Sequence, residues 1–169
     1  MGAVVHNLGE VNRWDREAFV ERLGWVFEHS PWVAERAWAT RPWTSLETLH
    51  GAMCQMVEAA PIALKLALIR AHPDLGSRAR MAEASAREQK GAGLDALSPE
   101  EFDRLQSLNR SYREKFGFPF VLAVRGKTKD EVLRALEERL EHDKETELET
   151  ALEQIYKIAW LRLKEAVTP

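Results

Sequence analysis

One histidine stands where the chain must change direction. His72 ends an apolar segment, and Pro73 follows it, so a helix over 62–72 cannot continue. Imidazole is the side chain that titrates nearest neutral pH, so His72 could donate or accept a proton. A histidine at a helix C-terminus also interacts favourably with the helix dipole, which is a purely structural role. From the residues alone, both interpretations are open.

A second group of polar side chains follows at 85–89. Ser85 and Glu88 are three positions apart, so they share a face if the segment is helical. Their spacing is typical of a capping box, with Ser85 at the N-cap and Glu88 at the third helical position. Together with Gln89 they could instead form a polar cluster that orients His72 or a substrate.

A third candidate, Arg125, directly follows an apolar run. Phe118–Val124 is seven residues long and predicts either a short buried strand or an extended loop. Arg125 follows it and could bind a ligand carboxylate through two hydrogen bonds. The alternative, which the residues alone favour, is an ordinary surface arginine at a turn beside Gly126. If the run is a loop, its backbone N–H groups need partners, and a bound polar ligand could supply them.

Helices are predicted almost throughout the rest of the chain. The predicted helix starts are Asp15, Pro31, the capping-box pattern Thr44–Glu47, Pro61, Ala82, Ser98 with Glu101, Thr128 with Glu131, and a restart after His142–Asp143. Gly117 is expected to end the helix that Ser98 begins. No hairpin turn signal or internal repeat is present. The pattern predicts an all-α, single-domain bundle of seven or eight helices over residues 1–169.

Composition excludes several classes of protein. The chain has 169 residues, 45% of them hydrophobic, and a formal net charge of −3, which argues against a nucleic-acid-binding surface. Arg78, Arg80 and Arg87 form a local basic patch, interpreted as solvated. No apolar run reaches the length that spans a membrane. No secretory signal pattern is present at Met1–Glu10, so a cytoplasmic location is expected.

The sequence also gives little support for a metal site or for cysteine chemistry. Cys54 is the only cysteine, so neither an internal disulfide nor a cysteine cluster can form. Cys54 is expected to be a small core residue within an amphipathic helix. The four remaining histidines show no metal-ligand spacing with one another: His6, His29, His50 and His142.

Five motifs in order resemble the family of OHCU decarboxylases, where OHCU is 2-oxo-4-hydroxy-4-carboxy-5-ureidoimidazoline. The resemblance runs from about Phe19 to Leu163. Its motifs are Phe27–Trp32, Ala71–Gly76, Ser85-x-x-Glu88-Gln89 followed by Gly93-Leu94, Leu108-Asn109-x-x-Tyr112, and Lys115–Val121. The pattern Ala151-Leu152-x-x-Ile155 in the last helix also fits.

The resemblance implies an all-helical homodimer that converts OHCU to (S)-allantoin in urate degradation without a metal or organic cofactor. It implies that His72 is the catalytic acid/base and that Glu88 is its partner. The residues implied to bind substrate are Pro73, Ser85, Gln89, Phe120, Val121, Leu122, Ala123, Val124 and Arg125. A cofactor is not expected, because the ring imine of the substrate can accept the electrons released with CO₂. The alternative is a non-catalytic dimeric scaffold or regulatory paralogue that keeps the fold.

Overall fold

The computed structural model describes residues 4–77 and 81–169. Within them lie nine α-helices, two 3-10 helices and one pair of two-residue strands, so the predicted all-α class is confirmed and the helix count exceeds the predicted seven or eight. The chain divides into two compact units, residues 1–71 with 156–169 and residues 72–155. Arg78 and Arg80, two members of the predicted basic patch, lie outside the described residues.

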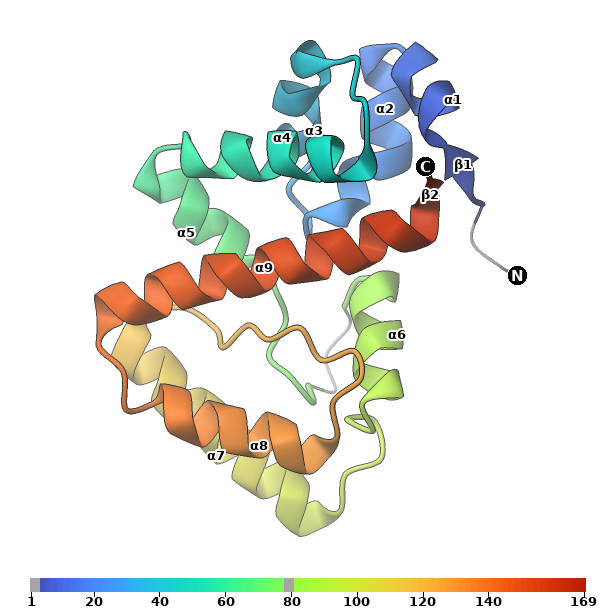
Figure 1. The fold of residues 1–169 in the computed structure, drawn as a ribbon. Coiled ribbons are helices and arrows are strands. Elements are labelled where there is room, and N and C mark those ends of the chain that lie inside the picture. The colour runs from blue at the N-terminus through green and yellow to red at the C-terminus, as the bar shows by residue number, and fades with distance from the viewer. Residues whose placement is uncertain (1–3, 78–80) are drawn as a thin grey trace. The chain divides into compact units, whose positions relative to one another are not determined.

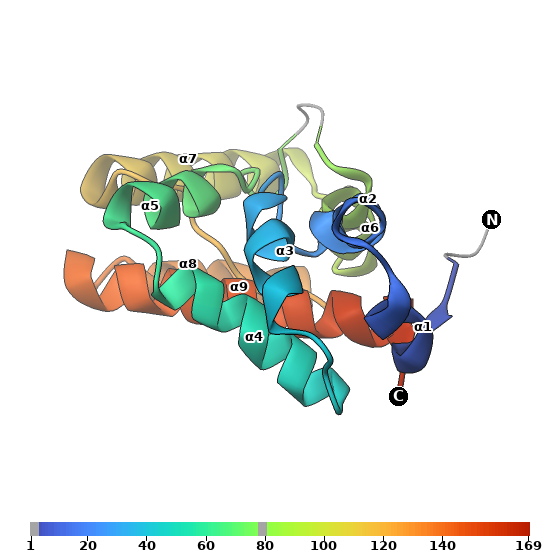
Figure 2. The same cartoon turned by 90° about the horizontal axis from the view of Figure 1, so that it is seen from above.

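The first unit contains the N-terminal helices. Its elements are β1 (His6–Asn7), α1 (Leu8–Arg13), α2 (Arg16–Leu23), η1 (Gly24–Val26), α3 (Trp32–Ala37), η2 (Trp38–Thr40), α4 (Leu46–Glu58), α5 (Ile62–Arg70) and β2 (Val167–Thr168). The second half of α9 (Lys144–Ala166) also belongs here. α3 packs against both α2 and α4, as Figures 1 and 2 show.

Two contacts in this unit join residues that are distant in sequence: a strand pair and a buried ion pair. β1 and β2 pair in parallel, with His6 opposite Val167. A buried ion pair joins Arg162 of α9 to Glu28, with 3.3 Å between Nη1 and Oε1. The same Arg162 nitrogen donates to the carbonyl oxygens of Trp25 and Val26. Because charges this well buried require partners, the pair fixes the end of α9 against the η1 segment.

The second unit contains α6 (Glu83–Gly91), α7 (Pro99–Phe116), α8 (Lys129–Arg139) and the first half of α9. α7 packs against α8 (Figure 1). The predicted starts of both helices are confirmed, because Ser98 with Glu101 and Thr128 with Glu131 each form a complete capping box. Gly117 ends α7 with φ of 80°, a left-handed conformation that glycine adopts without steric penalty.

Several boundaries differ from the sequence expectation. The helix predicted from Thr44 begins with Ser45 as its N-cap, whose side chain accepts from the Thr48 N–H. The helix predicted to reach His72 ends at Arg70, because Ala71 already caps it. Sequence patterns also missed α1, which is only six residues long.

Among the described residues, no single helix is both long and apolar enough to cross a bilayer. α4 and α5 meet that criterion only as a pair, and the chain bends by 115° between them.

Candidate functional site

All the residues implied to act on substrate belong to the unit formed by residues 72–155. His72 is its first residue and is 6% exposed. Pro73 is half-buried, and the segment from His72 to Ser77 contains no helix. The expected placement of His72 at a break in the chain is therefore correct, with the break two residues after the last residue of α5.

Two amide side chains hold the loop that follows His72. Gln89 Oε1 of α6 accepts a hydrogen bond from the Gly76 N–H at 2.8 Å. Asn109 Nδ2 of α7 donates to the Leu75 carbonyl oxygen at 3.0 Å. Both side chains are buried, so each bond satisfies backbone groups that water cannot reach. Gln89, implied to bind substrate, therefore also supports the backbone beside His72.

The capping-box interpretation of Ser85 and Glu88 is wrong. Ala82 occupies the N-cap position of α6, and its carbonyl already accepts the Ala86 N–H at 3.0 Å. Ser85 is thus the third residue of the helix, and Glu88 lies in its middle. Ser85 and Gln89 are one turn apart on the buried face of α6, and Glu88 is half-buried. The three side chains are therefore placed by the body of the helix rather than by its end.

The apolar run before Arg125 is a loop. No strand is assigned within 117–128, although Phe120, Val121, Leu122, Ala123 and Val124 are all buried. Arg125 is exposed at the end of the run. The loop lies against aromatic side chains of α7: the Tyr112 ring centroid is 6.0 Å from that of Phe118 and 5.3 Å from that of Phe120. Of the two structures that the sequence left open, the strand is wrong and the loop is correct.

Two helices hold the backbone of this loop. Arg139 of α8 donates from Nη1 to the Val121 carbonyl oxygen at 2.6 Å. Gln154 of α9 accepts the Ala123 N–H on Oε1 at 3.1 Å. The Val124 carbonyl oxygen accepts the Lys127 N–H, which forms the turn into α8. Hydrogen bonds therefore hold the loop backbone at Val121, Ala123 and Val124.

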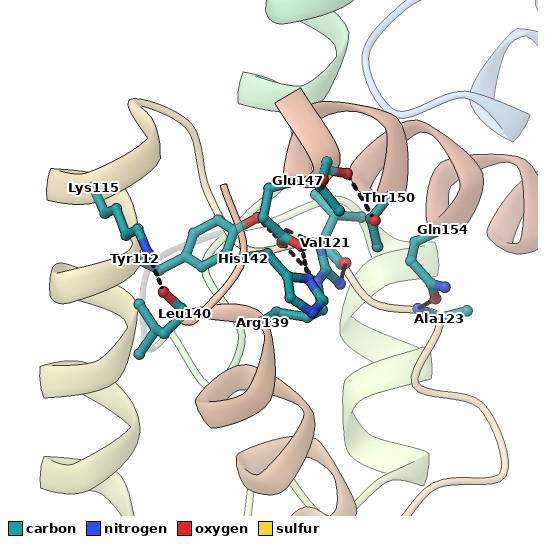
Figure 3. A network of polar contacts seen from close by, with 11 residues as sticks. Tyr112, Lys115, Val121, Ala123, Arg139, Leu140, His142, Glu147, Thr150 and Gln154 are labelled. Atoms are coloured by element: carbon teal, nitrogen blue, oxygen red, sulfur yellow. Dashed lines mark hydrogen bonds and ion pairs between the residues drawn. The ribbon is translucent and has the colours of Figure 1, made fainter. Parts of the chain in front are cut away.

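Arg139 belongs to a buried polar network, drawn in Figure 3. Glu147 is fully buried, and its Oε1 accepts from Arg139 Nε at 2.8 Å and from the Tyr112 hydroxyl at 2.6 Å. Its Oε2 lies 2.9 Å from His142 Nδ1. Burial and the hydrogen bond to Glu147 raise the pKa of Tyr112, so the phenol stays protonated and donates. The network joins α7, α8 and the start of α9.

One face of α7 supports both halves of the candidate site. Its buried residues are Leu105, Asn109, Tyr112 and Phe116, spaced four, three and four apart as on one helix face. Asn109 contacts the loop after His72, and Tyr112 contacts the Phe118–Phe120 loop. These two segments are distant in sequence, and a single helix holds both of them.

Sequence reasoning assigned no role to Arg139, Glu147 or Gln154. A signal for the two charged residues was present, since each extends a buried helical stripe. Arg139 follows Val132 and Leu136 at helical spacing, and Glu147 precedes Ala151 by four residues. A charged residue at an apolar position of a stripe indicates a buried ion pair, because an isolated charge is strongly disfavoured there. Gln154 is half-buried and carries no such signal.

Gly76 is the tightest point of the loop after His72. Its φ is +71°, and a Cβ there would lie 2.5 Å from Cδ2 of the buried Leu105. We expect Gly76→Ala to lower the free energy of unfolding by about 2–5 kcal/mol, the sum of left-handed strain and overpacking. Urea denaturation measures this loss.

The matched control for that variant is Gly93→Ala. Gly93 has a similar φ of +78°, but a Cβ there would meet nothing within 4 Å. Only the backbone strain of about 1–2 kcal/mol should remain. Equal losses for the two variants would show that Leu105 moves aside without cost and that overpacking adds nothing at Gly76.

Cys54 is half-buried in α4, with Sγ 3.4 Å from His50 Nε2. Burial, with a smaller effect of the nearby Glu58 charge, raises the pKa of its thiol to about 12. The thiolate is the nucleophilic form of cysteine, so this Cys–His pair is not poised for nucleophilic catalysis at neutral pH. Within the described ranges, no group of three or more His, Cys, Asp or Glu side chains is arranged to hold a metal ion.

Comparison with known proteins gives consistent results. The family model described as OHCU decarboxylase matches residues 12–164. The 2-oxo-4-hydroxy-4-carboxy-5-ureidoimidazoline decarboxylase of Haloferax volcanii is 49% identical over 158 residues, which cover 94% of each chain. The uric acid degradation bifunctional protein of Bacillus subtilis is 45% identical over 161 residues, covering 95% of this chain and 33% of that protein.

Solved structures give the same fold. A crystal structure of (S)-allantoin synthase matches with a TM-score of 0.76 and 34% identity, covering 95% of this chain and 54% of that one. A crystal structure of OHCU decarboxylase in the presence of (S)-allantoin matches with a TM-score of 0.70 and 25% identity, covering 90% and 97%.

Proposed function

Because this chain belongs to the OHCU decarboxylase family, we propose that it decarboxylates OHCU to (S)-allantoin in the degradation of urate. The match covers 94% of the length of the Haloferax relative. The observation that carries the proposal is the buried His72 at a chain break, beside a loop held by Gln89 and Asn109. A proton donor for catalysis needs such a fixed position.

The substrate supplies its own electron acceptor. One ring carbon carries the carboxylate and a hydroxyl, and the neighbouring ring carbon is an imine that carries the ureido group. When the bond to the carboxylate breaks, its electron pair moves into the ring and the imine nitrogen takes up the charge. One proton from the hydroxyl and one from solvent then complete the product, as the hydroxyl carbon becomes a carbonyl and the former imine carbon gains hydrogen. The protein has to orient the carboxylate and deliver a proton to one face.

We assign His72 the transfer of the proton from the hydroxyl towards the former imine carbon. Glu88 would orient the imidazole and favour its protonated form. Pro73, Ser85 and Gln89 would line the substrate on the same side. Since Gln89 Oε1 already accepts from Gly76, its amide nitrogen is the group that would donate to substrate.

The other side of the substrate would meet the loop Phe120–Val124 and Arg125. Backbone N–H groups of a held loop are fixed dipoles that can stabilise developing negative charge. Arg125 would bind the carbonyl oxygens of the ring or of the ureido group. Its exposure is consistent with a residue at the entrance to a site.

The test is an optical assay of the purified protein. Urate, urate oxidase and the intervening hydrolase generate OHCU in the cuvette, and circular dichroism follows the product. Uncatalysed decay gives racemic allantoin, so the proposal expects a rapid signal of one sign that scales with protein concentration. A signal no different from that of the mixture without the protein overturns it and favours the non-catalytic scaffold.

Arg125→Ala should raise KM about 5–30-fold, the effect of losing 1–2 kcal/mol of binding, with a smaller change in kcat. The exposed position of Arg125 makes a larger effect unexpected. Steady-state kinetics in the same assay measures both constants. Lys127→Ala is the control, since it removes a nearby positive charge from outside the proposed site. Unchanged kinetics for Arg125→Ala would remove this residue from the site.

The family resemblance also supports a cytoplasmic homodimer whose two compact units act as one domain. The single family match across residues 12–164 supports one domain. Light scattering coupled to size exclusion tests the dimer, which should have twice the 19.3 kDa mass of the chain. A species of 19.3 kDa at micromolar concentration would contradict it.

A further inference from the structure

We propose that Arg139 and Gln154 are positioning residues for the decarboxylation, and that they act by fixing the register of the Phe120–Val124 backbone. This inference rests on the proposed function, because it assigns the loop to the substrate side of the site. Neither residue belongs to the set implied to touch substrate. Both act through the loop, at points two residues apart.

Two hydrogen bonds anchor the backbone of this loop. Arg139 Nη1 donates to the Val121 carbonyl oxygen, and Gln154 Oε1 accepts the Ala123 N–H. In extended backbone, the polar groups of alternate residues point to the same side. These two bonds therefore turn the polar groups of Val121 and Ala123 towards α8 and α9, as Figure 3 shows for the two anchors.

Leu122 lies between the two anchored residues, and Val124 follows the second of them. The Val121–Leu122 peptide is trans, so the Leu122 N–H points opposite to the Val121 carbonyl and away from Arg139. We infer the same direction for the Val124 N–H from the alternation that the two anchors set. Across residues 4–77 and 81–169, neither N–H donates a hydrogen bond to another protein group. Both residues are buried, and a buried N–H without a partner is disfavoured by about 1–3 kcal/mol. A polar ligand that accepts from them removes this penalty, so the anchored register presents two donors to substrate.

Arg139 is itself rigidly held. Its Nε donates to the fully buried Glu147, and its Nη2 lies 3.4 Å from the Tyr112 hydroxyl oxygen. The guanidinium carbon lies 4.4 Å from the Phe120 ring centroid, which adds a cation–π contact to the same loop. A planar group with three nitrogens in use has one orientation, and lysine cannot reproduce it.

Catalysis by oriented groups is sensitive to small displacements of those groups. If the loop slips by one residue, the N–H groups of Leu122 and Val124 turn towards the helices. A misplacement of about 1 Å can reduce a rate by about 10²-fold. Release of one anchor, with the other intact, should have a smaller effect.

The experiment compares Gln154→Leu with Gln154→Glu. Gln154 is half-buried, so neither change should prevent folding. Leucine removes the acceptor, and we expect kcat/KM for OHCU to fall about tenfold with an unchanged Tm. Glutamate keeps an oxygen for the Ala123 N–H and should restore most of the activity. Glu153→Leu, at the exposed neighbouring position of α9, controls for the introduction of leucine.

Arg139→Lys is the second test. It keeps a positive charge beside Glu147 but loses the simultaneous contacts with Glu147, the Val121 carbonyl and the Tyr112 hydroxyl. It should lower kcat/KM by at least as much as Gln154→Leu. Wild-type kcat/KM for both variants overturns the proposal. So does a loss in Gln154→Leu that glutamate does not restore, or one that parallels a fall in Tm. An inactive wild-type protein would instead overturn the proposed function, on which this inference depends.

Discussion

Replacing His72 with asparagine should lower kcat for OHCU decarboxylation by about 10²–10⁴-fold, the contribution typical of one general acid or base. Asparagine is polar and smaller than histidine, so it fits the buried position without a proton to transfer near neutral pH. The circular dichroism assay should then show mainly the slow, racemic decay of the substrate. Thermal unfolding should show that the variant remains folded.

His29→Asn is the matched control. His29 is exposed and has φ of 44°, a left-handed conformation that asparagine tolerates better than most residues. This variant should keep wild-type kinetics and stability. If His72→Asn forms one-handed allantoin at a rate close to wild type, His72 does not transfer the proton.

The largest effect on stability is expected for Glu147→Leu. This change leaves the buried Arg139 without its carboxylate and the Tyr112 hydroxyl without its acceptor. Breaking a buried ion pair by removing one partner typically lowers the free energy of unfolding by about 3–5 kcal/mol. Urea denaturation monitored by tryptophan fluorescence measures the change.

Two further variants locate the source of that loss. His142→Gln removes only the contact to Glu147 Oε2 from a side chain that is 44% exposed, and should have an effect below about 1 kcal/mol. The double variant Arg139→Met with Glu147→Leu should recover part of the stability, because no buried charge is left unpaired. A Glu147→Leu protein as stable as wild type would show that the network contributes little to the fold.

Local signals in the sequence predict most of this fold. The capping boxes at Ser98 and Thr128, the N-cap Asp15 and the terminating Gly117 are confirmed, because each depends on residues within one helical turn. The same reasoning was wrong for Ser85 and Glu88. Their spacing fits a capping box, but Ala82 begins the helix three residues earlier without a side-chain cap. Spacing alone cannot distinguish a capping box at a helix start from the same residue pattern inside a helix.

Contacts between residues distant in sequence could not be predicted, because they depend on how the whole chain folds. The apolar run before Arg125 has no strand partner, and whether a partner exists depends on residues distant in sequence. The loop is instead held by side chains 18 and 31 residues away, Arg139 and Gln154. The family motifs include Gln89 and Asn109, which hold the loop after His72, but they do not include Arg139 or Gln154, which hold the loop before Arg125.

The buried face of α7 makes the two halves of the candidate site parts of one cooperative unit. Asn109 and Tyr112 lie within one turn of each other, so fraying or local unfolding of that turn releases the loop after His72 and the loop before Arg125 together. Warming should therefore not produce a half-assembled site with altered substrate preference. Activity should decline in a single step, together with the protection of the α7 amides from hydrogen exchange.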